Sequence, residues 1–281
     1  MFTAIENWQF VLVSADYRLA PQVGIKEMFD DVQDCIDFIR DPSGMARFLP
    51  EGIFDSQRLA VCGSGGGGYL ALLAGLHIYP TPLAVLALHP ITDPLGSHFI
   101  TTHPWDEEDR NGMDTKTAEA AMKPYLDPRG EVVTDWGPDG DDPPRGLLFK
   151  YALYRGNLAE LLHFDTTTNA QLDPANDKWR VPKQIAACGM PPTFILHGEA
   201  DKQVDVGQSD ELVGALRRVF GHDTFTCIVS YESPLGEGHA FDEGEDTDNE
   251  SEGEDDGLQA IPYERIVRYM NVMYNFMHSF V

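Results

Sequence analysis

The sequence predicts an α/β protein in which helices pack on both faces of a mostly parallel β-sheet. Three observations lead to this prediction. Short apolar runs recur along the chain, helical patterns follow most of them, and loops rich in glycine or histidine come where the runs end. Repeated strand–helix alternation is typical of a parallel sheet. With 281 residues, 42% of them apolar, the chain can bury the core of one large domain.

About five strands are expected, because five apolar runs have the length of a buried strand. They cover residues 10–16, 58–62, 83–88, 192–197 and 225–230. Helices are expected between and after them. The predicted helices cover residues 25–40, 69–77 and 205–220, and a last one that begins at Pro262.

The alternation stops between Thr92 and Pro191, where Pro, Asp and Gly clusters separate helical pieces and no clear strand occurs. We therefore expect three parts. Residues 1–91 and 192–281 form the core, and residues 92–191 form a helical cap inserted between two strands. An acidic run at residues 242–257 is expected to be a disordered loop within the second core part.

Charge and composition exclude several classes of partner. Asp and Glu number 46 against 20 Lys and Arg, so the net charge is −26, which disfavours nucleic acids and anionic membranes. No apolar stretch reaches the 18 or so residues of a membrane helix, and no signal peptide is recognisable. The four cysteines show no metal-ligand or disulfide spacing. These features predict a cytoplasmic protein without a metal site; the acidic run could attract a basic protein partner.

A glycine-rich turn at residues 63–68 joins a predicted strand to a predicted helix, and three interpretations stay open for it. It could be a nucleophile elbow, a strained turn that presents a serine above the sheet. It also fits G-x-G-x-x-G, a dinucleotide cradle, with Asp93 placed where a ribose-binding acid would be sought. The third interpretation is a flexible turn without chemical function.

Two further loops could supply an acid–base pair. Asp201 follows the strand at 192–197, where a carboxylate can orient an imidazole, although a loop Asp more often caps a turn. His239 lies between glycines after the last strand and could act as a general base, although a single loop histidine is more often solvated. The order elbow, Asp, His is that of the α/β-hydrolase triad.

The segment Val13-Ser14-Ala15-Asp16-Tyr17-Arg18-Leu19-Ala20-Pro21 resembles the D-Y-R-L-A-P-E signature of hormone-sensitive-lipase-like esterases, which belong to the α/β-hydrolases. The resemblance continues through the elbow, the Asp loop and the His loop. It implies an α/β-hydrolase fold, in which the five strands correspond to the family's strands four to eight. It also implies cleavage of carboxylic esters without a cofactor, with Asp201 orienting His239 as general base.

The sequence departs from this family at the elbow. Family elbows read G-D-S-A-G-G, and the ungapped alignment places Gly65 at the nucleophile position, between Gly63 and Gly67. Glycine relaxes a strained turn, so the turn can persist without the hydroxyl. Ser64 is a displaced nucleophile candidate, and Gly66 would supply a backbone N–H to the oxyanion.

Two more departures concern the start of the chain. The family's H-G-G-G oxyanion motif belongs upstream of the D-Y-R-L-A-P strand and is absent here, which suggests a fragment or a shortened gene model as much as an evolved protein. Gln22 replaces the family's Glu. Two functions follow: an esterase-like hydrolase of weak or no activity, or a non-catalytic relative that binds a small apolar ligand or a protein partner.

Overall fold

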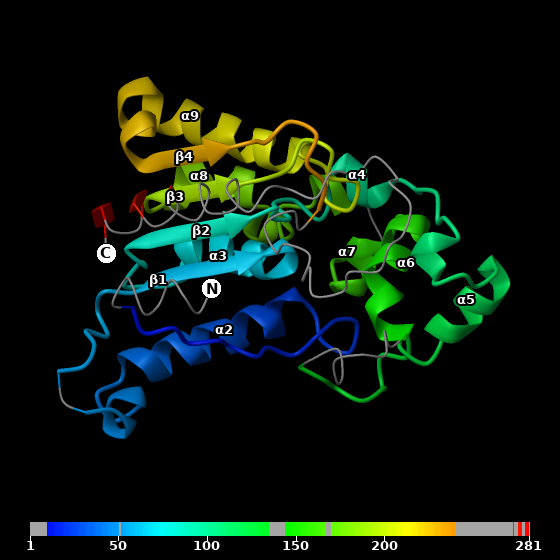
Figure 1. Cartoon of the computed structure of the whole chain (residues 1–281), viewed down its shortest axis with the longest axis horizontal. Helices are drawn as coiled ribbons and strands as arrows, with labels where there is room; N and C mark the ends of the chain where they lie inside the picture. Colours follow the sequence, from blue (N-terminus) through cyan, green and yellow to red (C-terminus); the bar gives the residue numbers. More distant parts are fainter. Residues whose placement is uncertain are drawn as a thin grey trace, which may run out of the picture.

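The computed structural model describes residues 10–50, 52–134, 144–166 and 170–239, together with residues 272, 275, 276, 279 and 280. Its centre is a sheet of four parallel strands in the order β1-β2-β3-β4 (Figure 1). The strands are β1 (Ala60–Ser64), β2 (Ala84–Leu88), β3 (Thr193–Leu196) and β4 (Val229–Glu232). The strands adjoin in register, with Ser64 beside Leu88 and Leu88 beside Leu196, so their carboxyl ends share one edge.

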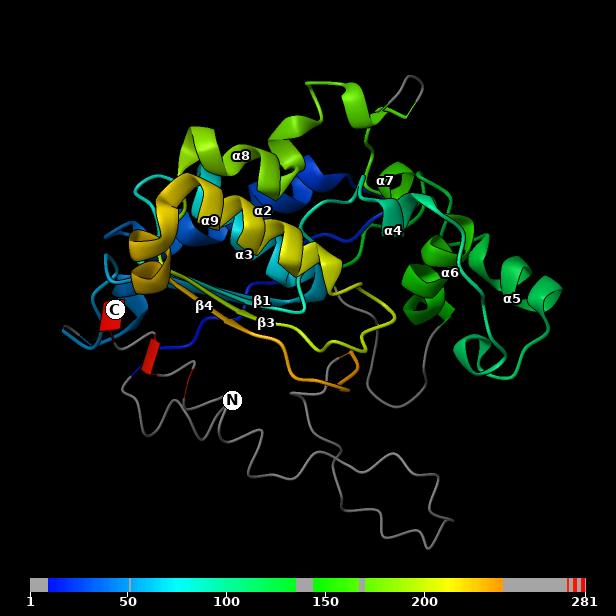
Figure 2. The same cartoon turned by 90° about the horizontal axis from the view of Figure 1, so that it is seen from above.

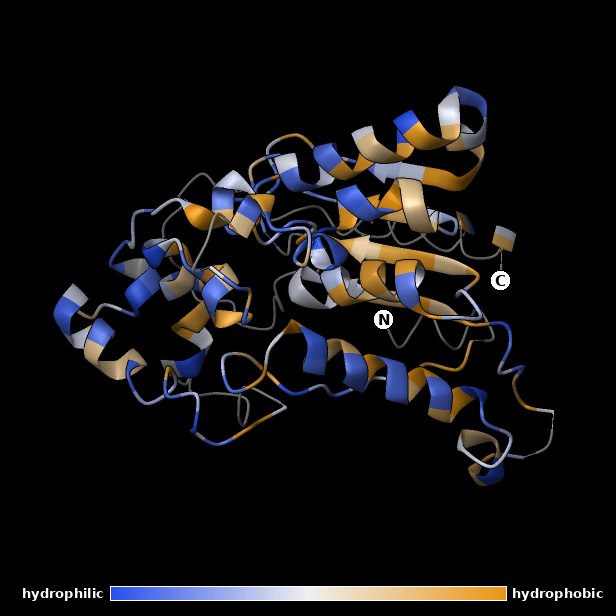
Figure 3. Ribbon diagram, turned by 180° about the vertical axis from the view of Figure 1, so that it is seen from behind, coloured by the Kyte–Doolittle hydropathy of each residue, from blue (hydrophilic) through white to orange (hydrophobic). Residues whose placement is uncertain are grey.

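Four helices lie on one side of the sheet (Figure 2). They are α2 (Ile25–Arg40), α3 (Gly65–His77), α8 (Val181–Cys188) and α9 (Gly207–Ile228). α3 is buried from Gly68 to Leu76, because it packs against β1 and β2 beneath α2 and α8. α2 is amphipathic, with alternating polar and apolar stretches along its ribbon (Figure 3).

The two faces of the sheet bury alternate residues of the same strands, as a strand period of two requires. Val85, Ala87 and Ile195 belong to the large core on the side of the four helices. Leu86 and Phe194 belong to a second cluster on the opposite face. The partly buried helical residues that pack on this second cluster are Val272, Phe276 and Phe280. The sheet is therefore covered by helices on both faces.

Other helices lie beyond the carboxyl ends of the strands, on the side to which the arrows point (Figure 1). They are α4 (Ser97–Ile100), α5 (Thr115–Met122), α6 (Leu148–Arg155) and α7 (Leu158–Leu161). The remaining pieces are 3₁₀ helices at Met45–Phe48, Glu108–Arg110, Pro144–Leu147, Ala170–Leu172 and Asp177–Trp179. Where the described residues fall between Thr92 and Pro191, none of them is in a strand. The limits of a cap at 92–191 stay a prediction.

Two strand predictions need correction. Residues 10–19 contain neither helix nor strand, and residues 11–16 are exposed, so the part of the chain that the structure describes contributes four strands to the sheet instead of five. Their apolar composition suits a strand, but a strand also needs a hydrogen-bonded neighbour, and β1 pairs with β2 alone among the described strands. The strand predicted at 225–230 begins only at Val229, because α9 continues past a kink at Gly221 to Ile228.

Other predictions fall outside the described residues, including the acidic run at 242–257 and most of the helix from Pro262. In the part of the chain that the structure describes, no helix combines the length and apolar character needed to cross a membrane.

Candidate active site

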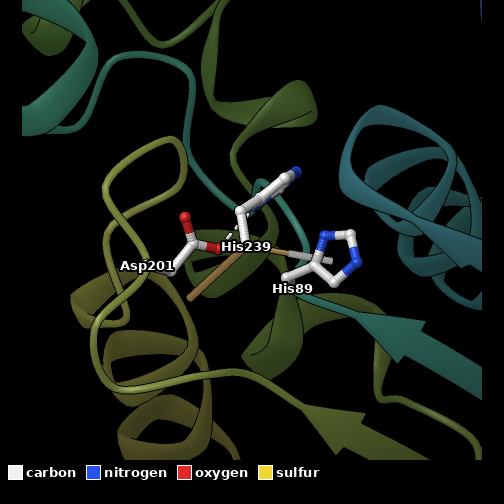
Figure 4. Close-up of side chains that lie close together, drawn as sticks. All are labelled: His89, Asp201 and His239. Atoms are coloured by element: carbon white, nitrogen blue, oxygen red, sulfur yellow. Dashed lines mark hydrogen bonds and ion pairs between the residues drawn. The ribbon is translucent and has the colours of Figure 1, made fainter. Parts of the chain in front are cut away.

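Asp201 and His239 meet at the carboxyl edge of the sheet, as the triad order predicted. His239 Nδ1 donates a hydrogen bond to Asp201 Oδ2 at 2.7 Å (Figure 4). The Asp201 side chain is fully buried, whereas that of His239 is 20% exposed. Since Nδ1 carries the proton of this bond, Nε2 of a neutral ring keeps its lone pair. The pair therefore has the form of an oriented base.

The Asp201 carboxylate is fixed by the loop that carries it. Its Oδ1 accepts hydrogen bonds from the backbone N–H groups of Gln203 and Val204, at 2.8 and 2.9 Å. Burial alone would raise the pKa of this carboxyl, but hydrogen bonds from His197, His239 and the Val204 N–H outweigh burial and hold the pKa well below its usual range. Asp201 is thus a buried carboxylate that is kept charged.

His197 lies behind Asp201 as part of this support. Its Nε2 donates to the Val204 carbonyl at 2.7 Å and lies 3.3 Å from Asp201 Oδ2. Because the carbonyl can only accept, Nδ1 is left to accept the hydroxyl of Ser209 at 2.7 Å. Sequence reasoning did not assign a role to His197, although it lies in the same loop motif as Asp201.

The loop carrying His239 rests directly on the loop carrying Asp201. Ala200 N–H donates to the Glu237 carbonyl at 2.8 Å. A Cβ on Gly198 would lie 2.4 Å from the same carbonyl oxygen and 2.7 Å from that of Gly238. Only glycine allows this approach, so Gly198 positions the His239 loop.

The glycine-rich turn has the backbone geometry of an elbow between β1 and α3. Gly65 has a φ of +51°, in the left-handed region, and a Cβ built on it would meet nothing within 4 Å. Gly63 is packed tightly: a Cβ built on this residue would lie 2.3 Å from the Gly67 backbone. The turn therefore needs glycine at 63 for space and favours it at 65 for conformation.

Ser64, the displaced nucleophile candidate, is the last residue of β1 and is exposed. Its backbone is extended, with φ −114° and ψ 149°. The hydrogen bonds of the described residues include none between Ser64 and the Asp201–His239 pair. Gly66 and Gly67 belong to the first turn of α3, whose N–H groups lack partners within the helix. Gly66 is thus placed where a backbone donor for an oxyanion is expected.

His89 is a member of this site that sequence reasoning missed. It directly follows β2, is 2% exposed, and its ring centroid lies 4.3 Å from that of His239. Its φ of +35° is uncommon for a residue with a side chain. The available signal was its position, since residues that follow parallel strands gather at the edge where ligands bind.

Asp93, which a dinucleotide site would assign to a ribose, is bound within the protein instead. Arg180 Nε donates to both carboxylate oxygens of Asp93, at 2.9 and 3.0 Å, and Nη2 donates at 2.6 Å. The side chain of Asp93 is 3% exposed and that of Arg180 is 9% exposed. Asp93 therefore forms a structural ion pair.

The segment that carries the esterase-like signature joins α2 to the helices beyond the sheet. Arg18 makes a bidentate ion pair with Asp31 of α2. Gln22 accepts from Arg145 at 2.9 Å and donates to the carbonyls of Tyr125 and Asp127 at 2.8 and 3.1 Å. A glutamate could not donate these last two bonds when ionised. The change from the family's Glu is therefore accommodated by an amide-specific contact.

Comparison with known proteins agrees with this architecture. Residues 3–137 match a family described as the alpha/beta hydrolase fold. Carboxyl esterase 2 from the mycorrhizal fungus Tuber melanosporum superposes with a TM-score of 0.54 at 16% identity, over all of this chain and 71% of the esterase. An alpha/beta hydrolase superfamily protein from Enterococcus faecalis gives 0.53 at 13% identity, over 93% of this chain and 76% of that protein.

Two curated relatives are similar in sequence. The non-reducing polyketide synthases mapC' of Penicillium brevicompactum and ausA of Aspergillus calidoustus are each 26% identical to this chain, over 74% and 90% of its length. The chain spans about a tenth of the length of either synthase, 10% and 11%. The family match, the parallel sheet and the solved structures together show that the chain has the α/β-hydrolase fold.

Proposed function

We propose that this chain hydrolyses small carboxylic esters slowly, with His239 as general base, Asp201 as the residue that orients it, and water as the nucleophile. The observation that carries the proposal is the 2.7 Å hydrogen bond between His239 and the buried Asp201 carboxylate, at the same sheet edge as an elbow that has no side chain at residue 65. Burying a charged carboxylate costs free energy, which its hydrogen-bond partners offset. An imidazole that such a carboxylate orients is suited to proton transfer.

Each proton in the proposed reaction has a donor and an acceptor. His239 Nε2 takes a proton from water, whose oxygen attacks the ester carbonyl carbon. The oxyanion that forms accepts a hydrogen bond from the Gly66 N–H at the start of α3, where the helix dipole also favours negative charge. The tetrahedral intermediate then expels the alcohol, which takes its proton back from His239. The space at Gly65 accommodates the water that replaces a serine hydroxyl.

Ser64 is the competing nucleophile. Its extended backbone and the absence of a hydrogen bond from its hydroxyl to His239 favour water. A serine that is shifted by one residue presents its side chain in another direction, and a displacement of about 1 Å can cost about 100-fold in rate.

A non-catalytic binding protein is the second candidate, and Gly65 favours it because the nucleophile position carries no reactive group. In this case the site binds a small apolar ligand or a protein partner, and hydrolysis does not exceed that in buffer.

One set of measurements separates the three possibilities. Hydrolysis of p-nitrophenyl acetate is followed with the wild type, D201N, H239A and S64A, and each protein is labelled with a fluorophosphonate and mapped by mass spectrometry. The water mechanism expects hydrolysis that falls at least about 100-fold in H239A, stays unchanged in S64A, and leaves no serine adduct. An adduct on Ser64 that is lost in H239A would establish the displaced serine. Folded protein with neither hydrolysis nor adduct would establish a binding protein.

A further inference from the structure

Three side chains with metal-ligating atoms meet at the carboxyl edge of the sheet. His89 follows β2, Asp201 follows β3 and His239 follows β4, and one ligand atom from each lies within 4.8 Å of the other two. Figure 4 shows His239 between the other two side chains. Because residues from three separate loops converge here, the cluster is a product of the tertiary fold.

His89 has no part in the proposed ester hydrolysis, yet it occupies a costly position. Its φ of +35° strains the backbone of a residue with a side chain. Its backbone N–H donates to the Leu196 carbonyl, which fixes the residue between β2 and β3. The ring is consequently held against His239 by the sheet itself.

The Asp201 carboxylate is oriented so that one oxygen faces the cluster. Oδ1 accepts two backbone hydrogen bonds, and Oδ2 faces His239. His197, 3.3 Å from Oδ2, is held in place by Val204 and Ser209. Such an outer set of hydrogen bonds, which fixes a ligand before the ion arrives, is typical of metal sites in proteins.

We infer that His89, Asp201 and His239 form a binding site for a divalent transition-metal ion of the Zn²⁺ type, held by two imidazole nitrogens and one carboxylate oxygen. Two nitrogens with one oxygen suit zinc and its neighbours, whereas Ca²⁺ and Mg²⁺ prefer oxygen ligands. Tetrahedral zinc at about 2.1 Å from its ligands spaces these atoms about 3.4 Å apart, so atoms that now lie up to 4.8 Å apart have to approach by up to about 1.4 Å.

Charge and exposure agree with this site. The ion adds two positive charges beside the Asp201 carboxylate, in a chain of net charge −26. Of the three side chains, that of His239 is partly exposed, so the cluster is in contact with solvent at this residue. The site shares two residues with the proposed acid–base pair, but it does not depend on ester hydrolysis, because metal binding is measured without substrate.

The test is a titration of the metal-free chain with Co²⁺, read by its visible absorption bands, and with Zn²⁺, read by calorimetry. Excess Mg²⁺ is present throughout, to occupy sites made of carboxylates alone. H89N is the main variant, because asparagine is close in size and tolerates a positive φ. H98N is the matched control: the ring of His98 also lies next to that of another histidine, His103, with centroids 4.4 Å apart, but among the described residues no third metal-ligating side chain forms a group with that pair.

The proposal expects one equivalent of Zn²⁺ on the wild type and on H98N, and Kd values at least about 10-fold weaker in H89N and H239N. Thermal melts establish that each variant is folded before it is titrated. Absence of binding to the wild type, or binding that H89N leaves unchanged, would overturn the site. Metal binding without esterase activity would support this site and contradict the proposed function. Esterase activity without metal binding would support the proposed function and contradict this site.

Discussion

The substitution Gly65→Ser places a hydroxyl at the nucleophile position of the elbow and tests whether a side chain at this position reaches His239. A Cβ at residue 65 meets no atom within 4 Å, so no packing has to change. The cost lies in the backbone, because a side chain at φ +51° is disfavoured by about 1–2 kcal/mol. At about 2–4 °C per kcal/mol, the melting temperature should fall by about 2–8 °C.

Activity should change in the opposite direction. An added hydroxyl that reaches His239 replaces a mobile water by a nucleophile fixed in the site, and this lowers the entropic cost of attack, so we expect p-nitrophenyl acetate hydrolysis at least about 100-fold faster than in the wild type. G65S should also acquire a fluorophosphonate adduct at residue 65, lost in the double variant G65S/H239A.

Gly65→Ala is the matched control, because it carries the same backbone cost without the hydroxyl. G65A and G65S should melt within about 1 °C of each other and differ only in rate and labelling. If both are folded and G65S hydrolyses the ester no faster than G65A, then residue 65 does not face His239, and the assignment of this turn as an elbow is wrong.

Three further predictions test the surroundings of the site. Arg180→Ala should destabilise the protein by about 3–5 kcal/mol in urea unfolding, since it leaves the buried Asp93 carboxylate unpaired; a change below 1 kcal/mol would contradict this. Gly198→Ala should lower kcat about 100-fold while the protein stays folded, because its Cβ displaces the loop that carries His239; an unchanged kcat would show that this contact does not position the base. Burial raises the pKa of Tyr231 to about 12, so its stabilising contribution, complete below pH 10, should fall as pH rises from 10 to 12. Urea unfolding over this interval should show a shallower loss in Tyr231→Phe, and equal slopes would refute the assignment.

The fold was predictable wherever the hydrophobic period was strong. The helix expected at 25–40 is α2 with the same bounds, and the strand expected at 83–88 is β2 at Ala84–Leu88. α2 has one apolar face, which defines a helix without reference to the rest of the chain. β2 is apolar on both faces because both faces of the sheet are covered, and this produces a continuous apolar run.

The strand predicted at residues 10–16 is wrong, because a strand depends on a partner elsewhere in the chain and not on its own sequence alone. Val11 and Leu12 are 44% and 45% exposed, despite a composition that suits a buried strand. A helix satisfies its own backbone hydrogen bonds, whereas a strand depends on a neighbour that the run itself does not specify. Periodicity can therefore indicate an extended segment without establishing that it pairs.

For the candidate site, chain order was more informative than composition. Asp201 and His239 were predicted to act together, and the structure brings them to 2.7 Å, while their catalytic roles stay a proposal. His89 lay in no motif, and a histidine before a proline resembles an ordinary turn. Only the strand register, which sets the end of β2 beside the ends of β1 and β3, shows why it reaches the same place.

The elbow separates the geometry of a site from its chemistry. At residue 65 glycine removes strain of about 1–2 kcal/mol that a serine would store, so this substitution stabilises the turn while it removes the nucleophile. No comparable gain in stability favours Asp201 and His89. Burying the Asp201 carboxylate costs free energy, and a positive φ strains the backbone of His89. If this group only filled space, apolar residues of equal volume would serve at lower cost. The costly part of the site is therefore the part that should bind or react. H89N removes a proposed metal ligand and leaves the base, whereas H239A removes both, so the comparison of the two variants separates metal binding from proton transfer.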